Sequence, residues 1–248
     1  MKTVFFLVIM LCFWSCVEEE APLTAEAIVK KSIEAQCNGN CDHATINFTF
    51  RKNKYTSIRD GGAYRLERII LDSISETKDV LSNKGFQRLI NNEMQEVADT
   101  TAIKLGDAVN SVHYFAQVPF GLEAPAVRKK LLGKTKIKEQ PYYEVEITFS
   151  EEGGGTDFDD VFIYWIHTKK FTVDYLAYKY AVNGGGIRFR EAYNERRIEQ
   201  IRFVDYNNFK PESLTVSLQQ LPKLFEKGEL KLLSKIETED ISVRFPKH

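Results

Sequence analysis

The amino-acid sequence predicts a mainly β (α+β) protein in which a single antiparallel curved sheet or half-barrel is covered by an inserted helical lid. The first observation is a series of runs rich in β-branched and aromatic residues, separated by Gly, Asn and Asp. The second is the segment from Thr100 to Leu132, where apolar residues recur at helical spacing instead. The third is the run from Val161 to His167, which is apolar on both faces and therefore needs a cover on each side.

The bulk composition is that of an ordinary globular chain. Of the 248 residues, 43% are hydrophobic and 28% are charged, which is enough apolar material for a core. The formal net charge is −1, whereas a nucleic-acid-binding surface needs a basic excess, so we expect no nucleic-acid partner. We expect one domain over residues 24–248, because all-β domains often reach this length.

The first residues have the layout of an export signal. Lys2 precedes an unbroken apolar run that is too short to span a bilayer, which predicts a signal peptide over residues 1–15. The pair Ser15-Cys16 resembles a bacterial lipobox, which implies lipidation of Cys16 and a tether over residues 16–23. The acidic run at 18–20 fits a solvated tether or a signal for the outer-membrane surface. This resemblance implies an outer membrane lipoprotein of the cell envelope, on the periplasmic or the surface face.

A helix and a pair of cysteines follow the tether. Thr24 is the expected N-cap of an amphipathic helix that extends to Gln36. Cys37 and Cys41 then enclose three residues, and in an exported chain this spacing favours a disulfide. A metal site is disfavoured because only His43 is near as a further ligand.

The next segments predict a meander of strands. Residues 44–97 alternate apolar and polar positions between short turns. Strands resume after the helical insertion, and residues 153–206 form four long ones. A short helix over Leu221–Lys227 and closing strands complete the chain.

The helical insertion is the expected lid. Its apolar positions are interrupted at Pro119-Phe120-Gly121, which predicts a break or hinge. Helices are the usual cover of an open sheet face, so we expect residues 100–132 to lie over the concave face in contact with Trp165.

The sequence contains none of the well-specified catalytic or cofactor motifs, so no catalytic residue and no cofactor is predicted. Asp157, Asp159 and Asp160 follow three glycines and could hold Ca²⁺, because hard cations take clustered carboxylates. The EF-hand pattern is not met, which favours an ordinary loop before a strand. We therefore predict no metal site.

Charged and apolar residues alternate in the run GIRFREAYNERRI. Arg188 and Arg190 share one face with Asn194 and Arg196, whereas Glu191 lies on the other. Surface strands usually present charges to solvent, and this interpretation is favoured. The alternative is an anion-binding patch, because arginine forms strong charge-assisted hydrogen bonds.

Several segments resemble a family of uncharacterised lipoproteins of the Bacteroidota. They are NSVHYFAQVPFGL (110–122), FSEEGGGTDFDDVFIYW (149–165), YLAYKYAVNGGGIRFREAYNERRI (175–198) and DYNNFKP (205–211). The similarity covers most of the mature chain, but no activity defines that family. More distantly, the signal peptide, the meander, the inserted helix and the long paired strands resemble the LolA/LolB type of lipoprotein carrier. That resemblance implies an open half-barrel whose concave face is covered by helices and shelters acyl chains.

The sequence leads to two functional hypotheses of different classes. The favoured one is a lipid-anchored, non-enzymatic envelope protein that binds an acyl chain, a lipid or a lipoprotein in an apolar cavity. The residues expected to line this cavity are Tyr114, Phe115, Phe120, Trp165, Tyr175, Ala177, Phe189 and Tyr193. The alternative is a surface hydrolase or glycan-binding module that uses the carboxylates of Asp157, Asp159, Asp160 and Glu191.

Overall fold

The computed structural model describes residues 22–153, 155–156, 158–181 and 184–246. The expected signal peptide over residues 1–15, the lipidation of Cys16 and most of the tether over residues 16–23 lie outside the described residues. Within the described ranges, no helix is long and apolar enough to cross a membrane.

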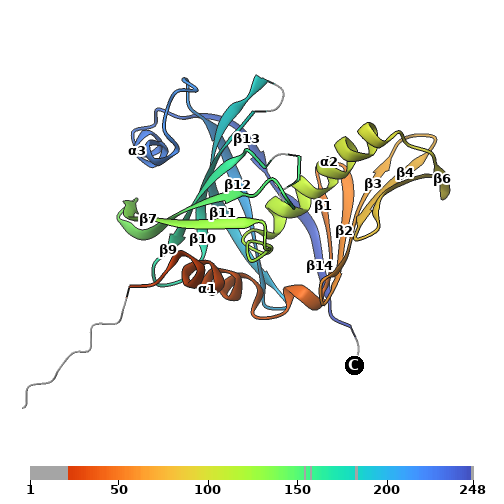
Figure 1. Ribbon diagram of the computed structural model, residues 1–248, viewed down its shortest axis with the longest axis horizontal. Helices are drawn as coiled ribbons and strands as arrows, with labels where there is room; N and C mark the ends of the chain where they lie inside the picture. Colours follow the sequence, from red (N-terminus) through yellow and green to blue (C-terminus); the bar gives the residue numbers. More distant parts are fainter. Residues whose placement is uncertain (1–21, 154, 157, 182–183, 247–248) are drawn as a thin grey trace, which may run out of the picture.

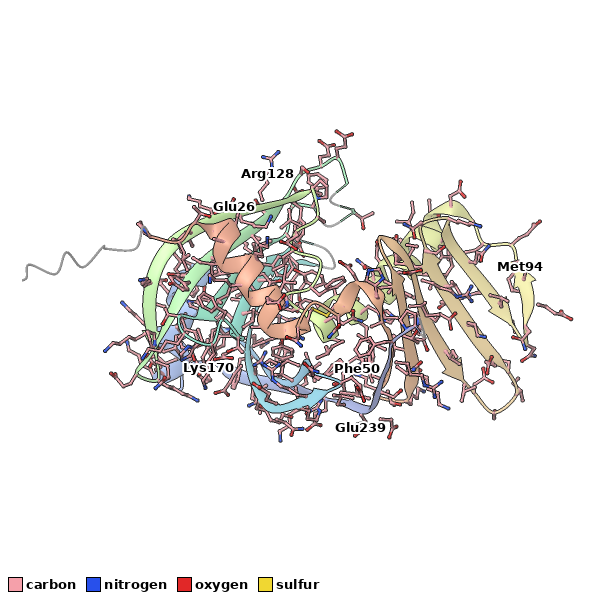
Figure 2. All side chains as sticks on the ribbon, turned by 90° about the horizontal axis from the view of Figure 1, so that it is seen from below. Glu26, Phe50, Met94, Arg128, Lys170 and Glu239 are labelled. Carbon is pink, nitrogen blue, oxygen red and sulfur yellow. A yellow bond between two sulfur atoms is a disulfide. The ribbon has the colours of Figure 1, made fainter. Side chains whose placement is uncertain are left out.

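In this part of the chain, the strands form two antiparallel sheets of seven strands each, and neither sheet closes into a barrel (Figure 1). The N-terminal sheet has the order β14-β1-β2-β3-β4-β5-β6, and the C-terminal sheet has the order β13-β12-β11-β10-β9-β8-β7. The mainly β prediction is confirmed, but the strands divide between two sheets instead of forming one. Figure 2 shows Glu26 on the first helix and Met94 on β6 at opposite ends of the molecule.

Consecutive strands in each sheet are mostly neighbours in space, as expected for a meander. The strands of the N-terminal sheet are β1 (Thr45–Phe50), β2 (Asn53–Asp60), β3 (Ala63–Leu71), β4 (Glu76–Ser82), β5 (Gly85–Ile90), β6 (Glu93–Gln95) and β14 (Thr238–Arg244). Those of the C-terminal sheet are β7 (Val127–Ile137), β8 (Gln140–Phe149), β9 (Val161–His167), β10 (Val173–Tyr180), β11 (Gly186–Ile198), β12 (Ile201–Lys210) and β13 (Lys231–Ile236).

The last two strands join the two sheets. β13 pairs with β12, where Ile236 lies opposite Tyr206, and β14 pairs with β1, where Thr238 lies opposite Phe50. Only Glu237 separates β13 from β14. The backbone therefore passes directly from one sheet to the other, and residues of both sheets can line one cavity.

A buried carboxylate holds this junction together. Asp205 on β12 accepts hydrogen bonds from the guanidinium of Arg196 (2.8 and 2.9 Å), from Nδ2 of Asn194 (2.6 Å) and from the backbone N–H of Thr238 (3.0 Å). Desolvation alone would raise the pKa of Asp205, but these donors outweigh it and hold the pKa below the usual value. β11, β12 and β14 are thus tied through one charged group.

Both faces of the C-terminal sheet are covered, as the two-sided apolar run of β9 predicts. Phe162, Tyr164 and Ile166 pack on the concave face with α1 (Ala25–Cys37) and α2 (Asp99–Gln117). Ile163 and Trp165 point the other way and pack under the 3-10 helix η3 (Leu218–Gln220) and α3 (Leu221–Glu226). Figure 1 shows α2 and α3 on opposite sides of this sheet.

The expected contact between the lid and Trp165 is wrong. Successive strand residues point to opposite faces, and Trp165 lies on the face that α3 covers. Its neighbour Tyr164 meets α2 instead, through a hydrogen bond between the hydroxyls of Tyr114 and Tyr164. The prediction of covers on both faces of this strand was correct, but the face of Trp165 was assigned to the wrong helix.

The lid is also shorter than the sequence predicts. α2 ends at Gln117, and the residues from Val127 onward form β7 instead of a second helical segment. Val127 pairs with Phe149 and Leu131 pairs with Val145 of β8, so the alternation of a strand governs this part of the chain.

The N-terminal helix begins where the sequence predicts. Thr24 is the N-cap of α1, and its Oγ1 accepts a hydrogen bond from the N–H of Ala27 (3.2 Å). Cys37 and Cys41 form the predicted disulfide, with their Cα atoms 5.2 Å apart. Both cysteines are buried in the apolar cluster that also contains Phe203, so the disulfide fixes the end of α1 against β12.

Candidate functional site

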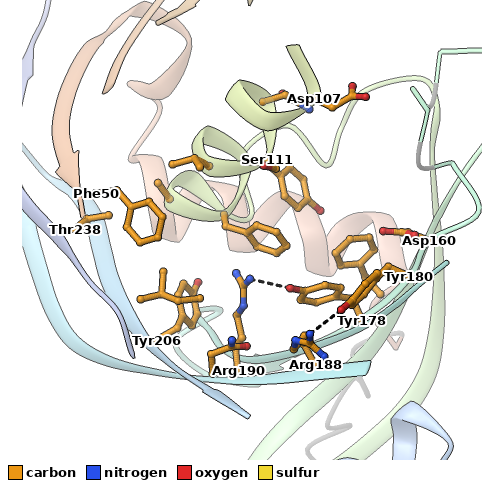
Figure 3. Close-up of a pocket in the computed structure, with 18 of the residues that line it drawn as sticks. Phe50, Asp107, Ser111, Asp160, Tyr178, Tyr180, Arg188, Arg190, Tyr206 and Thr238 are labelled. Carbon is orange, nitrogen blue, oxygen red and sulfur yellow. Dashed lines mark hydrogen bonds between the residues drawn. The ribbon is translucent and has the colours of Figure 1, made fainter. Parts of the chain in front are cut away.

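A cavity of about 550 Å³ lies between α2 and the concave face of the C-terminal sheet (Figure 3). Side chains from β9 to β12 form its floor, α2 covers it, and the ends of β1, β13 and β14 close a further side. This volume falls within the range of about 300–1,000 Å³ that is usual for small-molecule sites. The junction of the two sheets therefore forms part of the cavity wall.

Aromatic side chains form most of the wall. Phe162 on β9, Tyr178 on β10 and Tyr206 on β12 all face the concave side. The ring centroids of Phe162 and Tyr178 are 5.3 Å apart, and Phe115 of α2 lies 5.3 Å from Tyr178. Further aromatic side chains in the wall are Phe50, Tyr114, Phe149 and Tyr180. This wall presents ring faces and edges to whatever occupies the cavity.

Arg190 is a buried charge in this wall. Its side chain extends from β11 toward α2, and the residue is only 6% exposed. The guanidinium carbon lies 3.7 Å from the ring centroid of Phe115 and 5.2 Å from that of Tyr178. Nη2 donates a hydrogen bond to Oη of Tyr178 (2.8 Å), whereas Nε and Nη1 have no partner among the described residues. Cation–π contacts and one phenol therefore take the place of a carboxylate partner.

Arg188 makes a similar pair on the same face of β11. Its Nη2 donates a hydrogen bond to Oη of Tyr180 (2.6 Å), and its Nη1 donates to the carbonyl of Ile187 (2.9 Å). Each tyrosine accepts from an arginine and can still donate its own hydroxyl hydrogen. Two arginine–tyrosine pairs thus lie next to each other in the cavity wall (Figure 3).

The cover is attached to the floor by a pair of phenols. The hydroxyl of Tyr114 on α2 is hydrogen-bonded to that of Tyr164 on β9. Burial raises the pKa of both hydroxyls above the usual value, so both tyrosines stay neutral at physiological pH. Phe115 adds ring contacts from the same helix. α2 is therefore held over the cavity by a hydrogen bond between two uncharged hydroxyls, by ring contacts, and by the stacking of Phe115 on Arg190.

Other charged residues also line the cavity. Asp107 on α2 accepts a hydrogen bond from the hydroxyl of Thr156. Asp160 lines the cavity just before β9, and Arg51 lies at the end of β1 with its guanidinium 5.2 Å from the Phe50 ring. With Arg188 and Arg190, the described wall contains three arginines and two aspartates.

The predicted lining residues divide between two faces of the sheet. Tyr114 and Phe115 line the cavity. Four others lie together on the opposite face, in the apolar cluster under α3: Trp165, Tyr175, Ala177 and Phe189. These three aromatic rings and one methyl group pack together under α3, and they do not line the cavity under α2.

The remaining two predicted residues lie near the N-terminal sheet and the junction. Phe120 packs in the cluster of Ile46 and Phe48, and the guanidinium carbon of Arg59 lies 4.7 Å from its ring centroid. Tyr193 donates a hydrogen bond to Oε1 of Glu237 (2.7 Å) between β13 and β14. Neither residue lines the cavity.

The carboxylates of the alternative hypothesis do not converge on one point. Asp157 lies outside the described residues, and Asp159 is exposed. Asp160 lines the cavity, whereas Glu191 points to the opposite face and forms an ion pair with Nζ of Lys138 (2.6 Å). Among the residues that the structure describes, no group of three or more His, Cys, Asp or Glu side chains could hold a metal ion.

Sequence reasoning missed Phe162, Tyr178 and Tyr206 as lining residues, and it named Arg190 only in the alternative of an anion-binding patch. Phe162 carried a usable signal, because strand alternation places it on the same face as Tyr164. The interpretation of Arg190 as solvent-exposed is wrong, since α2 and the neighbouring rings bury it. The sequence predicted a helical cover, but it did not indicate that the face of Arg190 lies beneath it.

Comparison with known proteins gives the family of the chain. A model of the "Family of unknown function (DUF6503)" matches residues 2–238. The chain belongs to the DUF6503 family. No curated protein sequence matches this DUF6503 protein.

Solved structures show what this DUF6503 protein is similar to in fold. A LolA superfamily protein from Nitrosomonas europaea superposes with a TM-score of 0.52 and 14% identity, over 91% of this chain and 96% of that chain. A DUF1329 family protein from Desulfovibrio piger gives a TM-score of 0.45 and 7% identity, over 90% and 93% of the two chains. The second value is too low to support an argument. The first confirms the expected likeness to the LolA fold, and at this identity it concerns the fold alone.

Proposed function

We propose that this DUF6503 protein is a non-enzymatic binding protein that takes an acyl chain or another apolar ligand into the cavity under α2. The observation that carries the proposal is the aromatic wall, which surrounds a space large enough for one small ligand. Apolar burial is the main driving force for such binding. The LolA-like fold agrees with this function without demonstrating it.

The position of the cavity also supports a binding role. A sheet with two apolar faces needs a cover on each. The cover that contains α3 packs closely on one face and buries Trp165 and Phe189. α2 leaves space over Phe162 and Tyr178 on the other face. A concave pocket of this size with a largely aromatic wall is the usual form of a small-molecule site, so a ligand site is the physical explanation that we favour for the space.

The proposal places the protein in the cell envelope. The export signal over residues 1–15 and the lipobox-like Cys16 support this location, because a lipid on Cys16 would hold the cavity close to a membrane. The ligand would then come from the lipids or acylated proteins of the envelope.

Filling the cavity provides the test. Val204→Trp from the floor and Ala116→Trp from α2 would each place an indole in the space, whereas Ile103→Trp would place one on the exposed face of the same helix. We expect the two cavity variants to weaken the binding of decanol at least about tenfold, or about 1.4 kcal/mol, and Ile103→Trp to leave it unchanged. Isothermal titration calorimetry gives the affinities, and thermal melting checks the folding of each variant.

Two results would contradict the proposal. One is the absence of saturable binding of decanol and of other single-chain lipids by the wild-type protein. The other is undiminished binding by both cavity variants, since this would place the ligand elsewhere on the surface.

A further inference from the structure

We propose that the ligand of the cavity is an anionic amphiphile, with a carboxylate or phosphate group that binds Arg190 and an apolar tail along the aromatic wall. This inference rests on the proposed function and specifies the chemistry of its ligand. Arg190 is the central residue of the proposed head-group site, and Arg188, Tyr178 and Tyr180 supply the surrounding donors.

The burial of the Arg190 guanidinium has an electrostatic cost. A buried charge is unfavourable unless it is paired and hydrogen-bonded. The residue is 6% exposed, and the hydrogen-bond partner of its guanidinium among the described residues is the phenol of Tyr178. Its ring contacts with Phe115 and Tyr178 offset part of this cost, but they supply no negative charge. An anion from outside the chain would complete the pair.

Several hydrogen-bond donors around Arg190 remain available for a ligand. Nε and Nη1 of Arg190 have no hydrogen-bond partner among the described residues. The hydroxyls of Tyr178 and Tyr180 each accept a hydrogen bond from an arginine, which leaves their own hydrogens to donate. A carboxylate or phosphate is acceptor-rich, and hydrogen bonds from arginine to such groups are among the strongest in proteins. The donors therefore match an oxyanion better than a neutral hydroxyl group.

Phe115 lies against the guanidinium of Arg190. Its ring lies 3.7 Å from the guanidinium carbon of Arg190 and belongs to the helix that covers the cavity. Nε and Nη1 are buried in this arrangement, so an oxyanion reaches them only when a neighbouring side chain moves. Phe115 contacts the guanidinium and belongs to the cover, so a movement of this side chain would accompany head-group binding.

The surroundings of the proposed head-group site are largely apolar. The apolar wall continues from Arg190 through Phe162 to Phe149 on one side and through Tyr206 to Ile236 on the other. The carboxylates of Asp107 and Asp160 also line the cavity. That of Asp107 accepts a hydrogen bond from the hydroxyl of Thr156, and no ion pair links Asp107 to Arg190. An acyl tail attached to the oxyanion therefore finds an apolar surface next to the charge.

The test compares ligands that have the same tail and different head groups. Isothermal titration calorimetry at pH 8 measures decanoate, decyl phosphate and decanol against the wild-type protein, with acetate and inorganic phosphate as heads without tails. We expect decanoate, decyl phosphate or both to bind at least about tenfold more tightly than decanol, as a charge-assisted hydrogen bond predicts.

Substitutions assign this preference to Arg190. Arg190→Gln should reduce the affinity for the anionic ligands by about 10- to 100-fold and leave that for decanol unchanged. Arg190→Lys should retain part of the preference, since it keeps the charge and loses the planar donor group. The control Arg128→Gln removes the same charge from the exposed surface of β7 and should change nothing.

The outcomes separate the two proposals. If wild-type protein binds decanol as tightly as decanoate and decyl phosphate, the anionic head group is refuted and the proposed function stands. If no ten-carbon ligand binds, the proposed function fails as well. If acetate or inorganic phosphate binds as tightly as the ligands with tails, the amphiphile is refuted in favour of a small anion. If Arg128→Gln lowers the affinity as much as Arg190→Gln does, the assignment to Arg190 is wrong.

Discussion

At the scale of single residues, His113 shows how one buried side chain fastens α2 to the N-terminal sheet. Its Nε2 donates a hydrogen bond to the carbonyl of Glu67 (3.1 Å), and its ring lies edge-on to Phe48 and Tyr55. Burial lowers the pKa of His113 to about 4, because the apolar surroundings disfavour the imidazolium and the nearby Arg59 adds repulsion. This histidine is thus neutral in the folded protein over the physiological range.

This shift predicts an acid sensitivity of the fold. In the unfolded chain His113 binds its proton near pH 6.5, and in the folded chain only near pH 4, so the unfolded state gains the proton first. Stability should therefore fall as the pH falls from about 6.5 to 4, by at most about 1.4 kcal/mol per pH unit from this residue. Urea unfolding of wild type and His113→Gln across this range measures the effect, and the difference between them should shrink as the pH falls. An identical pH slope in both proteins would contradict the assignment.

Residue-scale predictions from the sequence succeeded where the local pattern was sufficient. Thr24 as N-cap and the disulfide of Cys37 with Cys41 depend on neighbours within a few positions, and the structure has both. The burial of Arg190 depends on α2, which is distant in the sequence. Alternation places Arg190 on a face, but it does not reveal which face receives a cover that leaves a cavity.

At the scale of elements, the short segment of η3 and α3 covers Trp165, which the sequence did not predict. Leu221 and Phe225 pack on Trp165, Tyr175 and Phe189, and Leu221 is completely buried. The sequence predicts a short helix here but gives no reason to choose it over α2 as the partner of Trp165. Both faces of β9 are apolar, so either helix could have covered either face.

This arrangement predicts that the two covers can be perturbed separately. Leu221→Ala should lower the free energy of unfolding by about 2–5 kcal/mol, because it leaves a cavity under α3. Ligand affinity should stay unchanged, since Leu221 lies on the face opposite the cavity. Leu214→Ala is a matched control at a 51% exposed position, where we expect an effect within about 0.5 kcal/mol. Urea unfolding and decanoate titration provide the two measurements, and a loss of affinity in a folded Leu221→Ala protein would argue against this separation.

At the scale of the whole molecule, the junction at Glu237 makes the two sheets into one structure. Asp205 is the charged centre of this junction and contacts Arg196 and Thr238 from different strands. The sequence predicts the strands themselves, but it contains no local signal for the passage from one sheet to the other. The pairing of Phe50 with Thr238 is set by the far ends of the chain.

Removal of this charge should weaken both sheets together. Asp205→Asn leaves the Arg196 guanidinium without its carboxylate, and we expect a loss of about 3 kcal/mol in the free energy of unfolding. Because the pKa of Asp205 is lowered by folding, the contribution of its charge is present above its usual pKa and is lost as the pH falls through the lowered value. Asp159→Asn, at an exposed loop position, is the control. A single cooperative transition at a lower urea concentration than in wild type supports this expectation, whereas an unchanged transition midpoint in Asp205→Asn would contradict it.

The pairing of β1 with β14 also dictates an order of assembly. Thr45 lies opposite Arg244, whereas the hairpins from β7 to β12 pair strands that follow one another directly. Contacts between distant parts of a chain form more slowly than local ones. During synthesis from the N-terminus, one edge of β1 thus stays open until β14 has been made. An open strand edge is a template for pairing with another chain, so the nascent protein is exposed to aggregation at this edge until β14 is complete.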